Sequence, residues 1–237
     1  MIKTGLILSL IAGALLLAGP IGSRVGLWPF VIGFLMLALS LLLGLTGASL
    51  SLAGGIKTGQ WPPALLGIVV GLAVVSVPSG VILSARGKPP IHDITTDTEN
   101  PPAFVATLPL RAGAANPPEY AGSDVAAQQR RAYPDIQPLT LRSSADEVFD
   151  RALAAVRALG WQVVASDRAA GRIEAVDTTL WFGFKDDVAI RIAGQPDGTT
   201  RLDVRSKSRV GVGDVGTNAR RVRTLLERMR SASDPTD

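Results

Sequence analysis

The stretch Gly5-Leu-Ile-Leu-Ser-Leu-Ile-Ala-Gly-Ala-Leu-Leu-Leu-Ala-Gly19 opens the chain, and two further apolar runs follow it, Leu27–Ala48 and Ala64–Ser84. Three charged residues occur before Arg86, and each lies outside these runs: Lys3, Arg24 and Lys57. A helix of about 20 apolar residues crosses the hydrocarbon core of a bilayer and satisfies its own backbone hydrogen bonds. The sequence therefore predicts a membrane region over residues 1–85, with three transmembrane helices at about 5–22, 27–48 and 64–84.

The spacing Gly67-Ile-Val-Val-Gly71 in the third run is the small-xxx-small pattern that lets two helices approach closely. Packing among the three spans accounts for it better than dimerisation of two chains. Charge alone leaves the orientation open, because cations flank both ends of the helices. The signal-like start, interpreted as an uncleaved anchor, favours an N-terminus inside the cell. Three spans then place residues 86–237 outside the cytoplasm.

Charge and composition exclude several classes of function. The chain carries a net charge of +4, but three Lys/Arg and no acids precede Arg86, and the chain from Arg86 onward holds 21 Lys/Arg and 20 Asp/Glu. The basic excess thus lies beside the membrane, and we expect no nucleic-acid partner. The chain has no cysteine and one histidine, His92. We therefore expect no catalytic residues, no metal site and no cofactor.

Residues 86–135 are rich in proline and poor in large apolar side chains, which predicts an extended tether. Asn-Pro-Pro occurs twice, at Asn100 and Asn116, and Phe104 or Tyr120 follows each copy. The repeat could be a recognition motif, but a stiff spacer explains it more simply.

Residues 136–231 have a globular pattern, and 232–237 are expected to form a disordered tail. Ser144 opens a capping box for a helix, and Asp214 is positioned to cap a last helix that begins near it. Alternating strands lie between the two helices. The predicted fold class is an α+β domain of order β-α-β-β-β-β-α, an antiparallel sheet with helices on one face.

Pro196-Asp197-Gly198 fits a three-residue hairpin loop, which fixes the register of the last two strands. That register places Arg191 opposite Asp203 and Asp187 opposite Lys207, so we predict two structural ion pairs. The neighbours Asp186 and Asp187 point to opposite faces of their strand, so they cannot share one substrate.

Several segments of this domain resemble one bacterial family: Tyr133-Pro-Asp-Ile136, Gly171-Arg-Ile-Glu-Ala175, Asp203-Val-Arg-Ser-Lys-Ser-Arg-Val-Gly211 and Asp214-Val-Gly-Thr-Asn218. The chain is identified as a membrane-anchored member of the family catalogued as domain of unknown function 1499, over about residues 96–230. The resemblance implies a module attached to membrane spans or a lipid anchor, with no established activity.

The end of the last strand offers a candidate anion site. Cations, hydroxyls and glycines precede a helix start there, and free amides could join them: Arg205, Ser206, Ser208, Arg209 and Gly216. In the alternative interpretation, Asp214 caps the helix and the arginines pair with acids of the domain. Asp214 stands where an external anion would need positive potential, which favours this structural interpretation.

We therefore expect a multi-pass protein of the bacterial inner membrane with a domain on the periplasmic side. Its expected role is non-catalytic, as an interaction or assembly module that contacts another membrane or envelope protein. The alternative is a binding module for a small anion or an anionic lipid headgroup, which the basic last helix could also contact. An enzyme of unrecognised type is the third hypothesis.

Overall fold

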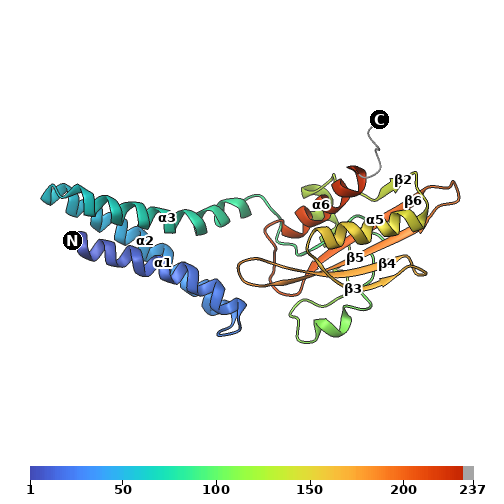
Figure 1. The fold of residues 1–237 in the computed structure, drawn as a ribbon, viewed down its shortest axis with the longest axis horizontal. Helices are drawn as coiled ribbons and strands as arrows, with labels where there is room; N and C mark the ends of the chain where they lie inside the picture. The colour runs from blue at the N-terminus through green and yellow to red at the C-terminus, as the bar shows by residue number, and fades with distance from the viewer. Residues whose placement is uncertain (232–237) are drawn as a thin grey trace. The chain divides into compact units, whose positions relative to one another are not determined.

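The computed structural model describes residues 1–231 and divides into two compact units. The first unit holds Met1–Arg86 together with Leu180–Gly183. The second holds Gly87–Thr179 and the chain from Phe184 onward. Figure 1 shows the helical unit and the unit built around the sheet.

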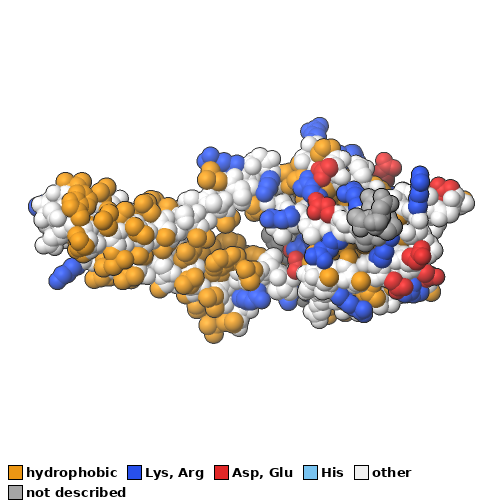
Figure 2. All heavy atoms as spheres, turned by 45° about the horizontal axis from the view of Figure 1, so that its top comes forward, with side chains coloured by type: hydrophobic (Ala, Val, Ile, Leu, Met, Phe, Trp, Pro, Cys, Tyr) orange, Lys and Arg blue, Asp and Glu red, His pale blue; other side chains and the backbone are white. Residues whose placement is uncertain are grey.

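The first unit contains three helices, α1 (Ile2–Arg24), α2 (Phe30–Thr58) and α3 (Trp61–Ala85). Their mean hydropathies of 2.1, 2.3 and 2.4 and their lengths suit a membrane span. Apolar side chains cover the visible face of this unit (Figure 2). The three predicted apolar helices are present, although α2 ends ten residues later than predicted, before the left-handed Gly59. The weakly polar residues 49–58 continue the helix because they include no proline.

Small residues line the interior of the helix bundle. A Cβ added to Gly71 would lie 2.6 Å from the carbonyl of Gly44, and Ser9 donates a hydrogen bond of 2.9 Å to the carbonyl of Gly67. Gly67 and Gly71 thus pack inside the bundle, as predicted. Most of the large apolar side chains are exposed on the outside of the bundle, where lipid would surround them, whereas Leu16 and Val74 are buried inside it.

The second unit is built on a six-stranded antiparallel sheet. Five strands have the order β1-β6-β5-β4-β3, and β2 also pairs with β6. The strands are β1 (Asp93–Thr95), β2 (Leu139–Leu141), β3 (Gln162–Asp167), β4 (Arg172–Thr178), β5 (Lys185–Gly194) and β6 (Thr200–Ser208).

Two helices, α5 (Ala145–Ala158) and α6 (Thr217–Ser231), cover one face of the sheet (Figure 1). Val148 and Phe149 of α5 and Leu225 of α6 pack there against alternate strand residues such as Ile190 and Val204. Alternation turns every second strand residue toward this core and the others to the opposite face. The predicted α+β class, the order from β2 to α6 and the helices on one face are confirmed.

The segment predicted as an extended tether, residues 86–135, is instead mostly part of the folded domain. It supplies β1, a 3-10 helix η1 (Leu108–Arg111) and the helix α4 (Ser123–Ala132). Gln129 of α4 forms two hydrogen bonds with the backbone of Thr95, of 3.0 and 2.6 Å, so α4 is tied to β1. The prediction was wrong because it required many large apolar side chains, whereas a few of them, Ile91, Ile94 and Tyr133, join the core and polar contacts hold much of the remaining segment. The predicted disordered tail, 232–237, lies outside the described residues.

Candidate functional site

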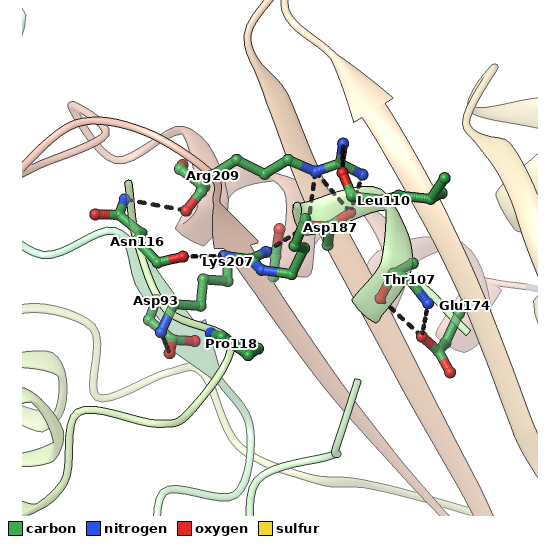
Figure 3. A network of polar contacts seen from close by, with 12 residues as sticks. Asp93, Thr107, Leu110, Asn116, Pro118, Glu174, Asp187, Lys207 and Arg209 are labelled. Carbon is green, nitrogen blue, oxygen red and sulfur yellow. Dashed lines mark hydrogen bonds and ion pairs between the residues drawn. The ribbon is translucent and has the colours of Figure 1, made fainter. Parts of the chain in front are cut away.

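The sheet face opposite α5 and α6 carries charged side chains, and residues Thr96–Gly122 lie over it. We call this segment the strap. On β6, Asp203, Arg205 and Lys207 alternate with residues that face the helices, and all three are at least 97% buried. Charged groups at this depth need partners, because an unpaired buried charge is costly. The strap provides many of them (Figure 3).

Arg205 lies at the centre of the network. Its Nε and Nη2 donate to the two carboxylate oxygens of Asp93, at 2.9 and 2.8 Å. Its remaining donors reach the carbonyls of Pro102, at 3.3 Å, and Pro118, at 2.9 Å. A guanidinium with both a bidentate carboxylate and two carbonyls has its positive charge compensated inside the domain.

Two aromatic rings enclose the same guanidinium. The Cζ atom of Arg205 lies 4.6 Å from the ring centroid of Phe104 and 5.6 Å from that of Tyr120. Burial raises the pKa of Tyr120 to about 12, and the negative charge of Asp93 adds to this shift. The two Asn-Pro-Pro-x-aromatic repeats therefore form a clamp, each giving one carbonyl and one ring to Arg205. The predicted role as a stiff spacer is therefore wrong, because both repeats contact the folded domain.

Lys207 is 1% exposed, and its ammonium lies 3.0 Å from Asp93 and 2.6 Å from the carbonyl of Glu119. Burial lowers the pKa of Lys207, and the attraction of Asp93 opposes this shift. Lys207 is opposite Asp187 in the sheet, as predicted, but the predicted ion pair between them is wrong. Lys207 binds Asp93 of β1 and the carbonyl of Glu119 in the strap, and Asp187 binds Arg111 of the strap. These partners lie in the segment predicted as an extended tether.

Asp187 is fully buried and binds two arginines. Arg209 donates to it from Nε at 3.0 Å and from Nη2 at 2.7 Å, and Arg111 of the strap forms the second ion pair. Arg209 also donates a 2.6 Å hydrogen bond to the carbonyl of Leu110. The 3-10 helix η1 is thus fixed to β5 and to the end of β6.

Glu174 of β4 is fully buried and holds the start of η1. Its carboxylate accepts hydrogen bonds from the backbone amides of Val105, Ala106 and Thr107, and from the Thr107 hydroxyl, at 2.8 to 3.1 Å. Successive amides that converge on one carboxylate form an anion nest. In this domain the anion is a side chain of the protein itself.

The predicted pair of Arg191 and Asp203 is present. Arg191 donates to Asp203 from Nε at 3.2 Å and from Nη2 at 2.8 Å, and the two are opposite each other in the predicted register. Arg201 joins the same carboxylate at 2.9 Å, and Asp97 of the strap accepts from both arginines.

The helix side of the sheet holds a second polar cluster, around Arg221 of α6. Arg221 pairs with Asp177 and Asp186, each at 2.7 Å, and donates to the Ser206 hydroxyl at 3.0 Å. Burial raises the pKa of Asp186, and Arg221 opposes this shift. Asp186 and Asp187 therefore serve opposite faces, as predicted.

The residues of the candidate anion site are engaged within the domain. Ser206 and Ser208 bond to the side chain of Asn218, at 2.7 and 2.8 Å. Arg205 and Arg209 are held by Asp93 and Asp187, as described above. The amide of Gly216 donates to Asp214 at 2.8 Å, and that carboxylate also accepts from the amide of Asn218 at 2.6 Å.

Both predicted caps are formed. Asp214 stands at the start of α6, where an external anion would have to bind, although α6 itself begins three residues later than predicted. Ser144 and Glu147 form the predicted capping box of α5. Within residues 1–231 no three His, Asp or Glu side chains gather in a group that could hold a metal ion.

The chain has three helices that are long and apolar enough to span a bilayer. They are joined to an α+β domain with a strap on one sheet face, and this combination defines a membrane-anchored module. A family model described as protein of unknown function (DUF1499) matches residues 93–229, and the chain belongs to this family. The match begins at β1 and therefore includes the strap. A comparison with curated proteins finds no match.

Proposed function

We propose that the protein is a non-catalytic interaction module of the bacterial cell envelope. Its three helices anchor it in the inner membrane, and its domain binds another membrane or envelope protein through the strap. One observation carries this proposal: the strap exposes three large apolar side chains on a backbone that the buried network holds in place. These are Val105, Leu108 and Leu110, which are 46%, 43% and 48% exposed.

Rigid presentation favours binding, because a surface that is already ordered loses little entropy when a partner arrives. The amides of Val105–Thr107 are bound to Glu174, and the carbonyl of Leu110 is bound to Arg209. The exposed side chains therefore project from a fixed backbone. Apolar groups on a polar surface are typical centres of protein interfaces.

The rival hypotheses gain less support from the site. The cations proposed for an anion site are bound to internal carboxylates and carbonyls, so an external anion would have to displace them. The carboxylates of Asp93 and Asp187 are likewise bound to arginines of the domain, as in structural ion pairs, and this gives little support to an enzyme. An extracytoplasmic location rests on the signal-like start and on the odd number of spans.

Photocrosslinking from the strap tests the proposal. A photoreactive residue placed at Leu110 of the full chain, in cells, should give a discrete adduct with a different protein. The same residue at the exposed Asp197, in the β5–β6 loop, should not give it. Adding Leu108→Asp should abolish the adduct at Leu110. Equal products from both positions, or an adduct that contains two copies of this chain, would contradict the proposal.

Reporter fusions at Asp237 test the location separately. Alkaline phosphatase fused at this position should be active, because it folds only outside the cytoplasm. A fluorescent protein that matures only in the cytoplasm should give no fluorescence at the same position. The opposite result would place the domain in the cytoplasm.

A further inference from the structure

The second exposed apolar surface lies on two loops at one end of the sheet. Leu180 and Trp181, in the β4–β5 loop, are 79% and 50% exposed, and Val212, in the β6–α6 loop, is 78% exposed. Soluble surfaces seldom carry side chains of this size so openly in neighbouring loops. The strap does not include them, so they require an explanation of their own.

Hydrogen bonds place both loops at the end of the sheet where the chain arrives from α3. The amide of Arg209 donates to the carbonyl of Lys185 at 3.0 Å, so the two loops leave adjacent strand ends. The amide of Ser208 donates to the carbonyl of His92 at 2.9 Å, and His92 belongs to the segment that enters β1. Lys88 donates to the carbonyl of Val215 at 2.8 Å.

Covalent geometry keeps this end of the domain close to the bilayer. Lys88 follows Ala85, the last residue of α3, by three positions, and three residues span at most about 11 Å of chain. Because Lys88 also contacts the β6–α6 loop, that loop stays near the end of a membrane helix. The α1–α2 connection emerges on the same side, since α2 and α3 cross the membrane in opposite directions.

The β4–β5 loop has a fixed shape. The amide of Thr179 donates to the carbonyl of Phe184 at 2.9 Å, and the amide of Phe184 donates to the Thr179 hydroxyl at 2.9 Å. Gly183 has φ of +69°, a backbone conformation that favours glycine. The tip, Leu180–Gly183, belongs to the same compact unit as the membrane helices, and the ring of Phe182 stacks on Phe34 of α2 at 4.6 Å.

We infer that Leu180, Trp181 and Val212 insert into the boundary between headgroups and acyl chains of the bilayer that α1–α3 span. Tryptophan favours this boundary because its ring is apolar and its indole N–H is polar. Exposed Lys88 and Lys185 flank the two loops and would meet the headgroups of anionic lipids.

Fluorescence quenching in reconstituted vesicles tests this inference on the full chain. The chain has no cysteine, so Leu180→Cys, Trp181→Cys and Val212→Cys each create one labelling site for an environment-sensitive dye. Asp197→Cys is the matched control, because Asp197 is exposed in the loop at the opposite end of β5 and β6. The vesicles contain phosphatidylcholine and phosphatidylglycerol, with a nitroxide on part of the lipid acyl chains.

The nitroxide lipids should quench the three test positions several-fold more than the control position. Quenching no stronger than at the control would overturn the inference. A blue-shifted but unquenched dye would also overturn it, because protein and not lipid would then cover the loops. A protease-resistance profile unchanged by labelling verifies that each variant is folded.

Discussion

Asp93→Asn should destabilise the domain much more than Lys207→Met, although both changes remove one charge from the same buried contact. Asp93 is 1% exposed and is the shared partner of Arg205 and Lys207. Its replacement leaves two buried cations beside a neutral amide. Removal of Lys207 leaves the bidentate pair of Asp93 and Arg205 in place.

The magnitudes follow from these remaining charges. Breaking a buried pair by removing one partner costs about 3–5 kcal/mol, because the other charge is left uncompensated. Lys207→Met should cost about 1–2 kcal/mol, for the hydrogen bond that the carbonyl of Glu119 loses. Burial already lowers the pKa of Lys207, so the folded domain holds this charge at a cost that methionine does not have.

Pulse proteolysis in urea, on the full chain in detergent, measures the free energy of unfolding of the domain. With a slope of about 2 kcal/mol per molar urea, Asp93→Asn should lower the midpoint by about 1.5–2.5 M. Asp135→Asn is the control: its half-exposed pair with Arg223 should contribute about 0.2–1 kcal/mol. Equal midpoints for Asp93→Asn and Lys207→Met would refute the reasoning.

Three further predictions concern the strap and the turns. Glu174→Gln should speed hydrogen–deuterium exchange at Val105–Thr107, because an amide cannot accept from all the donors that the carboxylate satisfies; unchanged exchange would show that other contacts hold these amides. Burial raises the pKa of Tyr120 from 10.0 to about 12, so its contribution to stability is present below pH 10 and is lost as the pH rises to about 12. In a Tyr133→Phe background, the tyrosinate absorbance of Tyr120 should appear only near pH 12 in the folded chain and near pH 10 in urea. Gly171→Ala should lower the urea midpoint clearly more than Gly198→Ala: both glycines have positive φ, which costs alanine about 1–2 kcal/mol, but only at Gly171 would the new Cβ collide with a carbonyl of the neighbouring strand.

Periodicity and turn chemistry were enough to predict the scaffold. The apolar runs gave three helices because the length of a membrane span depends on little else. The Pro196-Asp197-Gly198 loop gave the register of β5 and β6, because a hairpin loop of known length determines which residues are opposite each other. Arg191 and Asp203 therefore met as predicted.

The strap could not be predicted in the same way, because its anchors are polar. Charges at alternate positions of β6, such as Asp203, Arg205 and Lys207, look like a solvated face in a single sequence. Their burial depends on a segment that is distant along the chain. The two repeats that end at Phe104 and Tyr120 were the available signal, and in the structure both rings contact the Arg205 guanidinium.

A network of buried ions adds little stability compared with an apolar core, but it determines position strictly, because each donor must meet one acceptor. The strap has few large apolar side chains, so these directional contacts are what fix its backbone. If rigid presentation is what makes the strap bind, weakening its support should weaken binding without any change to the surface. Glu174→Gln should therefore reduce the photocrosslink from Leu110, although Glu174 is fully buried. Gly198→Ala, a turn substitution outside the strap, should leave the yield unchanged; an equal loss in both variants would show that general stability, and not the held strap, governs binding.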